Sequence, residues 1–221
     1  MHDVTMGSLF ALTTERQAQL DVAVRRLAKD ECRITSTAFF DEAEVQILRD
    51  LALAQKFRTA QTEIKHKSRS VFQDFAVCFP APRVGAFDAV ANLLEIGLSR
   101  AGAGLAPSPF EGPICLEDFA IQHYPAGSRG IGIHRDGLRY RQIVVIITLE
   151  GESRLFSCDD REGTNKQPID DQPGRIVLLS AAGFAGREGE DARPLHGVDQ
   201  VTGGRLSIGF RCAPTPPLPT A

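Results

Sequence analysis

The sequence predicts an α+β protein, in which helices from the first half pack on a mostly antiparallel β sandwich or barrel formed by the second half. Two observations lead to this fold class. Up to Pro113, apolar side chains recur with helical spacing; after it, short runs rich in Val, Ile, Leu and Phe alternate with clusters of Gly, Pro, Asp and Asn. Helices followed by strands are typical of a chain whose helices cover one face of a β core.

Three segments predict helices. Thr14, with Gln17 three residues later, has the pattern of a capping box for the first, and Asp41 and Glu44 open the second. The third is expected over about 87–100. The expected apolar faces are Leu20, Val24 and Leu27 in the first helix, Val45, Leu48, Leu51 and Ala52 in the second, and Val90, Leu93, Leu94 and Leu98 in the third.

Five runs in the second half predict β-strands. Each is short, rich in β-branched and large apolar residues, and bounded by residues that favour turns. They cover 114–124, 142–150, 153–158, 175–180 and 204–212. Clusters of Gly, Pro, Asp and Asn separate these runs, and this spacing is typical of a mostly antiparallel sandwich or barrel.

Composition excludes several classes of protein. Of the 221 residues, 43% are hydrophobic and 24% are charged, which excludes a collagen-like, coiled-coil or fully disordered chain. No run approaches the roughly 18 apolar residues of a membrane helix, and 1–14 lacks the pattern of a secretory signal. The five cysteines are odd in number and form no C-x-x-C pair, which favours a reducing, cytoplasmic location. The net charge of −3 provides no general attraction to nucleic acid or to an anionic membrane.

His134 and Asp136 are the first candidates for a chemical role. They follow the apolar run 130–133 at the expected end of a strand, where side chains at i and i+2 point to the same side. His196 is a third candidate, far along the chain. Two imidazoles and one carboxylate on one side of a metal leave positions open, as in non-haem Fe(II) sites that react with O₂. We therefore predict His134, Asp136 and His196 as metal ligands at a catalytic centre.

The last predicted strand has two different faces. Arg205, Ser207, Gly209 and Arg211 share one face by the period of two, and the alternating apolar residues share the other. Two arginines that point into a barrel would be buried charges, which is costly unless an anion meets them. The guanidinium group matches a carboxylate in bidentate fashion, so a dicarboxylic acid is the expected partner.

These motifs resemble the iron(II)- and 2-oxoglutarate-dependent oxygenases, and within them the AlkB-like dioxygenases. The resemblance covers 114–211. The stretch 121–127 looks like the Asn-x-Tyr-x-x-Gly stretch of that group, His134-x-Asp136 like its metal motif, and 205–211 like its Arg-x₅-Arg strand. The resemblance implies a double-stranded β-helix, a jelly-roll or cupin-like barrel, with the N-terminal helices packed on its outer sheet.

The resemblance also implies cofactors and roles for single residues. Fe(II) would be held by His134, Asp136 and His196, with 2-oxoglutarate as co-substrate and O₂ as oxidant. The residues implied to bind 2-oxoglutarate are Tyr124 and Arg205 at its distal carboxylate, and Arg211, Ser207 and Gln122 near its metal-chelating end. Gln122 stands where the family has Asn.

One structural domain with three parts is expected. Residues 1–112 form a helical and substrate-loop region, 113–212 form the catalytic double-stranded β-helix, and 213–221 form a proline-rich tail. The sequence makes no prediction of oligomeric state.

The expected reaction is hydroxylation of a C–H bond in a small, polar or anionic molecule, with 2-oxoglutarate and O₂ converted to succinate and CO₂. Arg135, Arg139 and Tyr140 follow the metal motif and are candidates for binding this substrate. Arg135, Arg139 and Arg141, with the basic stretch 56–69, suggest a local basic mouth that would suit an anion. The loop 183–194 is either a lid or a surface excursion. The lack of Trp and the acidic net charge count against the alternative, AlkB-like demethylation of N-alkylated nucleic acid bases. A second alternative is a non-catalytic barrel that binds a metal or ligand.

Overall fold

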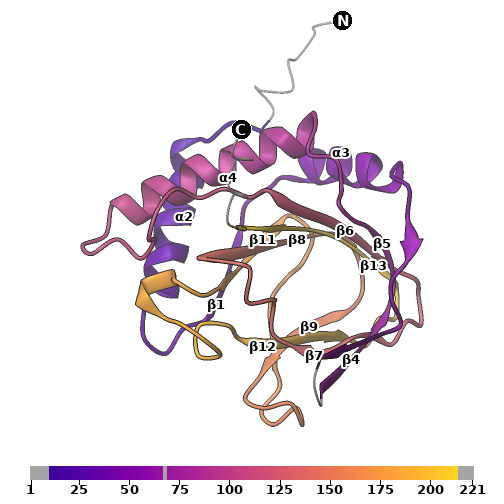
Figure 1. The fold of residues 1–221 in the computed structure, drawn as a ribbon. Helices are drawn as coiled ribbons and strands as arrows, with labels where there is room; N and C mark the ends of the chain where they lie inside the picture. Colours follow the sequence, from indigo (N-terminus) through magenta and orange to yellow (C-terminus); the bar gives the residue numbers. More distant parts are fainter. Residues whose placement is uncertain (1–9, 67–68, 214–221) are drawn as a thin grey trace, which may run out of the picture.

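Two antiparallel β-sheets face each other, and helices cover the outer face of one of them (Figure 1). The structure is a computed structural model that describes residues 10–66 and 69–213. Most of the proline-rich tail, and most of the segment tested for a secretory signal, lie outside the described residues. Among the described helices, none is both long and apolar enough to cross a membrane.

The larger sheet has seven strands and the smaller has six. In spatial order, the larger consists of β1 (Ile34–Ala38), β11 (Arg175–Ser180), β8 (Ile143–Gly151), β13 (Arg205–Arg211), β6 (Asp118–Tyr124), β5 (Ala76–Cys78) and β2 (Arg58–Thr59). The smaller consists of β10 (Gln167–Pro168), β9 (Arg154–Cys158), β12 (Leu195–Asp199), β7 (Gly130–His134), β4 (Arg69–Asp74) and β3 (Glu63–His66). Each sheet keeps two edge strands within the described ranges, so the closed jelly-roll barrel of the sequence prediction is not seen.

The three predicted helices are present. They are α2 (Thr14–Leu27), α3 (Glu42–Leu53) and α4 (Ala86–Ala103), and they pack over the larger sheet (Figure 1). The capping box predicted at Thr14 is wrong by one residue. Thr13 is the N-cap, because its backbone is still extended and its hydroxyl accepts a hydrogen bond from the Arg16 amide at 3.2 Å. At α3 the capping box is complete, with Asp41 and Glu44 each accepting from the other's amide.

The five predicted strands correspond to β6, β8, β9, β11 and β13. In β13, the apolar residues that alternate in the sequence face the core under the helices. On β13, Leu206, Ile208 and Phe210 are buried under the helices. The opposite face of the same strand looks toward the smaller sheet, where Arg205 and Ser207 are buried. A second, smaller apolar cluster lies between the sheets and includes Tyr124, Ile131 and Val198. The polar face of β13 is therefore enclosed, as predicted.

The Ile208→Ala variant tests the core between the helices and the larger sheet. Ile208 is fully buried, so its truncation leaves a cavity and is expected to lower the free energy of unfolding by about 2–5 kcal/mol. Urea denaturation measures this loss. The matched control is Val22→Ala on α2, because Val22 is 68% exposed and its truncation should change the unfolding free energy by less than about 0.5 kcal/mol. Equal losses in both variants would contradict this placement of the core.

Candidate metal centre

The three predicted ligands converge at one end of the smaller sheet. His134 ends β7 and His196 lies near the start of β12, and the two are direct partners in the antiparallel ladder. Their ring centroids are 4.3 Å apart. The Asp136 Oδ2 atom lies 3.6 Å from the His196 Nε2 atom. Pairing of β7 with β12 therefore brings together residues that are distant in the sequence.

A β-bulge sets the direction of the His134 side chain. In the ladder, His196 opposes His134 and Val198 opposes Ile131, so β7 advances three residues while β12 advances two. In a regular strand, residues three apart point to opposite faces. The extra residue in β7 turns His134 and Ile131 to the same face, with Ile131 in the cluster between the sheets.

The backbone around the two histidines fixes their tautomers. His134 Nδ1 lies 2.8 Å from the carbonyl oxygen of Gly132, and His196 Nδ1 lies 3.1 Å from that of Pro194. A carbonyl oxygen only accepts hydrogen bonds, so each Nδ1 donates, and in a neutral ring the lone pair is then on Nε2. Histidine ligands of metals commonly donate their other ring N–H to a backbone carbonyl in this way.

The charges also suit a divalent cation. Burial, together with the neighbouring His196, lowers the pKa of His134 to about 4, so its imidazole is neutral near pH 7. Burial alone would raise the pKa of Asp136, but His196 and Arg211 hold it below its ordinary value. The site thus combines a neutral imidazole at His134 with a carboxylate at Asp136.

The donor set fits a metal, but the side chains are not yet arranged around one. Within residues 10–66 and 69–213, no three His, Cys, Asp or Glu side chains form a ready-made metal cluster. Asp136 Oδ1 instead accepts from Arg211 Nε at 3.5 Å. Two ligands about 2.1 Å from one ion at a right angle are ~3 Å apart. Asp136 Oδ2 and His196 Nε2 lie 3.6 Å apart, so the two side chains would have to move slightly closer together to bind one ion.

Strand pairing also gathers the residues implied to bind 2-oxoglutarate. In the ladder between β13 and β6, Arg205 opposes Tyr124 and Ser207 opposes Gln122. Tyr124 is 1% exposed, and burial raises the pKa of its hydroxyl, which stays protonated. Both cross-strand pairs thus lie on neighbouring strands of the larger sheet.

Both arginines of β13 have carboxylate partners within the protein, in addition to the dicarboxylic acid that the sequence leads us to expect. The Arg205 Nη1 atom donates to the carboxylate of Asp171 and, at 3.1 Å, to the Ser153 hydroxyl. Arg211 pairs with Asp136 and, at 3.6 Å, with Asp118. Sequence reasoning missed Asp171 and Asp118 because nothing in their local sequence shows which distant cation they meet.

Carboxylates also neutralise the arginines that follow the metal motif. Arg139 donates to Asp118 at 2.6 Å and to the Tyr140 hydroxyl at 2.7 Å. Arg135 lies 3.4 Å from Glu190, and Arg141 pairs with Glu111 and Glu188. Because each of these arginines pairs with a carboxylate, they do not form the uncompensated basic mouth that the sequence suggested.

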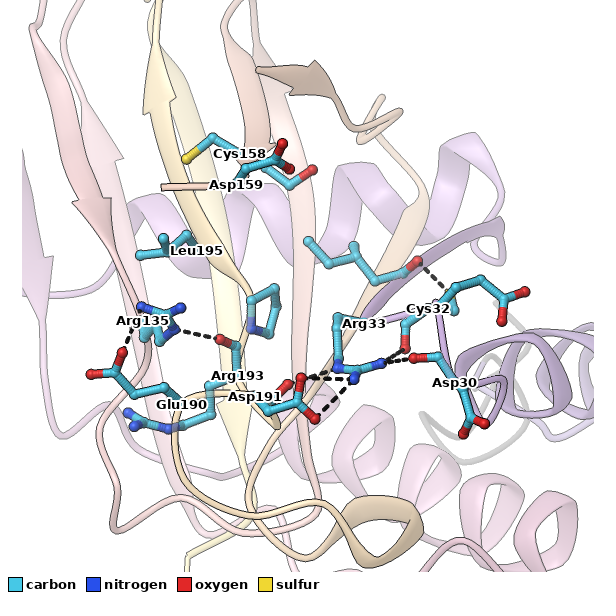
Figure 2. Close-up of a pocket in the computed structure, with 14 residues that line it drawn as sticks. Asp30, Cys32, Arg33, Arg135, Cys158, Asp159, Glu190, Asp191, Arg193 and Leu195 are labelled. Carbon is cyan, nitrogen blue, oxygen red and sulfur yellow. Dashed lines mark hydrogen bonds and ion pairs between the residues drawn. The ribbon is translucent and has the colours of Figure 1, made fainter. Parts of the chain in front are cut away.

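Two hydrogen bonds to backbone oxygens and one ion pair anchor the end of the loop 183–194. Arg193 Nη1 donates to the backbone oxygen of Asp136 at 2.7 Å, and Arg135 Nε donates to the backbone oxygen of Arg193 at 2.9 Å. Asp191 accepts two hydrogen bonds from Arg33, both at 3.0 Å (Figure 2). These contacts favour a fixed segment over a free lid, and they tie the loop to the backbone beside a candidate ligand.

A pocket of about 590 Å³ lies against this loop (Figure 2). Arg135 and Leu195, the chain neighbours of His134 and His196, line it. Ser157 also lines it and is the ladder partner of His196 on β9. The pocket therefore borders the two strands that bear the histidines.

Comparisons with known proteins give fold-level matches alone. No family model and no curated protein matches the sequence. Among solved structures, a prolyl hydroxylase from Trichoplax adhaerens, in complex with a peptide fragment of the hypoxia inducible factor oxygen degradation domain, aligns with a TM-score of 0.63. It is 15% identical, and the alignment covers 90% of each chain. A 2OG-Fe(II) oxygenase family oxidoreductase from Burkholderia pseudomallei aligns with a TM-score of 0.55 at 15% identity, covering 88% of each chain.

The AlkB-like part of the resemblance has weaker support. OsALKBH1 aligns with a TM-score of 0.51 at 14% identity, over 80% of this chain and 97% of the other. Prolyl hydroxylase structures reach higher TM-scores. The similarity therefore extends to the wider group and does not single out the AlkB-like branch. The chain has the fold of the 2-oxoglutarate- and iron(II)-dependent oxygenases.

Proposed function

We propose that the protein is an Fe(II)- and 2-oxoglutarate-dependent dioxygenase that hydroxylates a C–H bond of a small polar substrate. The observation that supports this most strongly is the convergence of His134, Asp136 and His196, with both Nδ1 atoms bound to backbone carbonyls. When bound, iron, O₂ and 2-oxoglutarate supply the oxidising chemistry, and 2-oxoglutarate is converted to succinate and CO₂.

The protein's own residues orient and shield this chemistry. His134, Asp136 and His196 hold the metal through the two Nε2 atoms and the carboxylate. Arg211 holds the Asp136 carboxylate from the side. The protonated hydroxyl of Tyr124 and the free donors of Arg205 serve the distal carboxylate of 2-oxoglutarate. The apolar cluster between the sheets excludes bulk water from this end of the site.

The proposal requires the substrate to be polar, but it does not require a negative charge on it. A basic mouth formed by Arg135, Arg139 and Arg141 was the reason to expect an anion, and each of these arginines pairs with a carboxylate. The same pairing removes positive charge that a nucleic acid backbone would need. The small-molecule hypothesis therefore remains ahead of demethylation of nucleic acid bases.

A substrate screen that follows succinate formation tests the proposal. The panel contains free amino acids, nucleotides, proline-containing peptides and N-methylated oligonucleotides, each with Fe(II), 2-oxoglutarate and O₂. We expect substrate-dependent succinate with a small molecule, and none with the His196→Ala variant. Formaldehyde release from methylated oligonucleotides, with binding that weakens steeply as salt rises, would instead establish the nucleic acid alternative. Turnover of a peptide alone would replace the small-molecule assignment.

A further inference from the structure

A buried carboxylate already occupies one side of the arginine assigned to 2-oxoglutarate. Arg205 on β13 is 3% exposed, and Asp171, which precedes β11, is 9% exposed. The Asp171 Oδ2 atom accepts from Arg205 Nη1 and, at 2.8 Å, from the Thr148 hydroxyl on β8. Strands β8 and β13 are neighbours, so Thr148 holds Asp171 directly beside the guanidinium.

The contacts of Arg205 are one-sided. Its hydrogen bonds to Asp171 and Ser153 both use Nη1, and within the described residues no hydrogen bond from Nη2 or Nε is present. Tyr124 opposes Arg205 from the other neighbouring strand, β6. The positive charge is therefore neutralised, while part of the donor capacity of the guanidinium remains free.

We infer that Asp171 determines the affinity and selectivity for the co-substrate, because its carboxylate competes with the distal carboxylate of 2-oxoglutarate for Arg205. This inference rests on the proposed function. Binding of 2-oxoglutarate places a second negative charge beside a guanidinium that has already been neutralised by the first. In a buried site such like charges repel strongly, since the effective dielectric constant is low. The chain thus weakens its own co-substrate binding.

The Asp171→Asn variant isolates the charge. Asparagine has nearly the same shape, and its amide oxygen can still accept from Arg205 and Thr148. We expect the dissociation constant of 2-oxoglutarate to fall about 10- to 100-fold, as removal of one nearby like charge implies at an effective dielectric constant of about 20. Calorimetric titration with Fe(II) in the absence of O₂ measures binding without turnover.

Two controls separate competition from a structural effect. The first is 2-oxopentanoate, which has the same chain length but a methyl group in place of the distal carboxylate, so its affinity should not change in Asp171→Asn. The second is Asp170→Asn, which removes a neighbouring carboxylate that pairs with Arg175 at 3.1 Å and is 55% exposed. It should leave the affinity for 2-oxoglutarate at the wild-type value. If Asp171→Asn does not fold by circular dichroism, Asp171→Ser provides the same test with a smaller neutral side chain.

The outcomes distinguish this inference from the proposed function. If the wild type binds 2-oxoglutarate and Asp171→Asn binds it equally well or more weakly, the inference is overturned. The proposed function is then still intact. An equal gain for 2-oxopentanoate and 2-oxoglutarate also overturns it, because the distal carboxylate would not be involved. Absence of 2-oxoglutarate binding in the wild type and every variant overturns both. Selective tightening for 2-oxoglutarate supports both.

Discussion

Replacement of His196 with alanine is expected to abolish stoichiometric Fe(II) binding. The variant leaves only His134 and Asp136 at the centre, and the second imidazole, which the Pro194 carbonyl orients, is lost. With two ligands in place of three, the ion is no longer held on one face. Anaerobic incubation with Fe(II), desalting and measurement of iron per protein give the stoichiometry.

His123→Ala is the matched control for that experiment. His123 lies on β6 beside the Phe57 ring, with the ring centroids 5.7 Å apart, and it is not one of the converging residues. Its variant should retain one iron per chain. Thermal melts of both variants check that they are folded. Wild-type iron affinity in folded His196→Ala would show that His196 is not a ligand.

Replacement of Arg205 with alanine is expected to have two large effects. Asp171 would become a buried carboxylate without its cation, which typically lowers stability by about 3–5 kcal/mol. The distal carboxylate of 2-oxoglutarate would lose its anchor, so its dissociation constant should rise by about two to four orders of magnitude. Urea denaturation and calorimetry measure the two effects separately, and iron binding should be nearly unchanged.

The double variant Arg205→Ala, Asp171→Asn separates these effects. Removal of both charges should restore most of the lost stability, because no unpaired carboxylate remains, but it should not restore 2-oxoglutarate binding. If Arg205→Ala binds 2-oxoglutarate normally and Arg211→Ala does not, the roles assigned to the two arginines are reversed.

The sequence predicts best where one periodic pattern decides the structure. Strand β11 was predicted with the observed bounds, because its apolar run is buried on both faces and polar or turn-forming residues flank it. The alternation in β13 likewise assigned Arg205 and Leu206 to opposite faces. By contrast, β1 was not predicted. Its residues Ile34–Ala38 are mostly small and polar, and the strand forms through pairing with β11 at the sheet edge.

The sequence predicts the candidate site only in part, for a related reason. The spacing of His134 and Asp136 is local, so their shared side of the chain could be inferred. The partners of charged residues are set by tertiary structure. Asp118 and Asp171 are ordinary acidic residues in the sequence, and only folding places them beside Arg139 and Arg205. These carboxylates neutralise the arginines, so the surplus of positive charge that the sequence suggested is absent from these pairs.

The extra residue in β7 makes the candidate metal centre sensitive to chain length as well as to residue identity. Removing the extra residue would leave a regular ladder in which Ile131 and His134 still share a face. Adding one residue between them, with the bulge retained, instead exchanges inward and outward positions, because side chains in a strand alternate. Such a change would leave His134, Asp136 and His196 in the sequence while His134 no longer faced the other two. A homologue can thus conserve every ligand in an alignment and still lack the site, and the length of this strand is the feature to compare first.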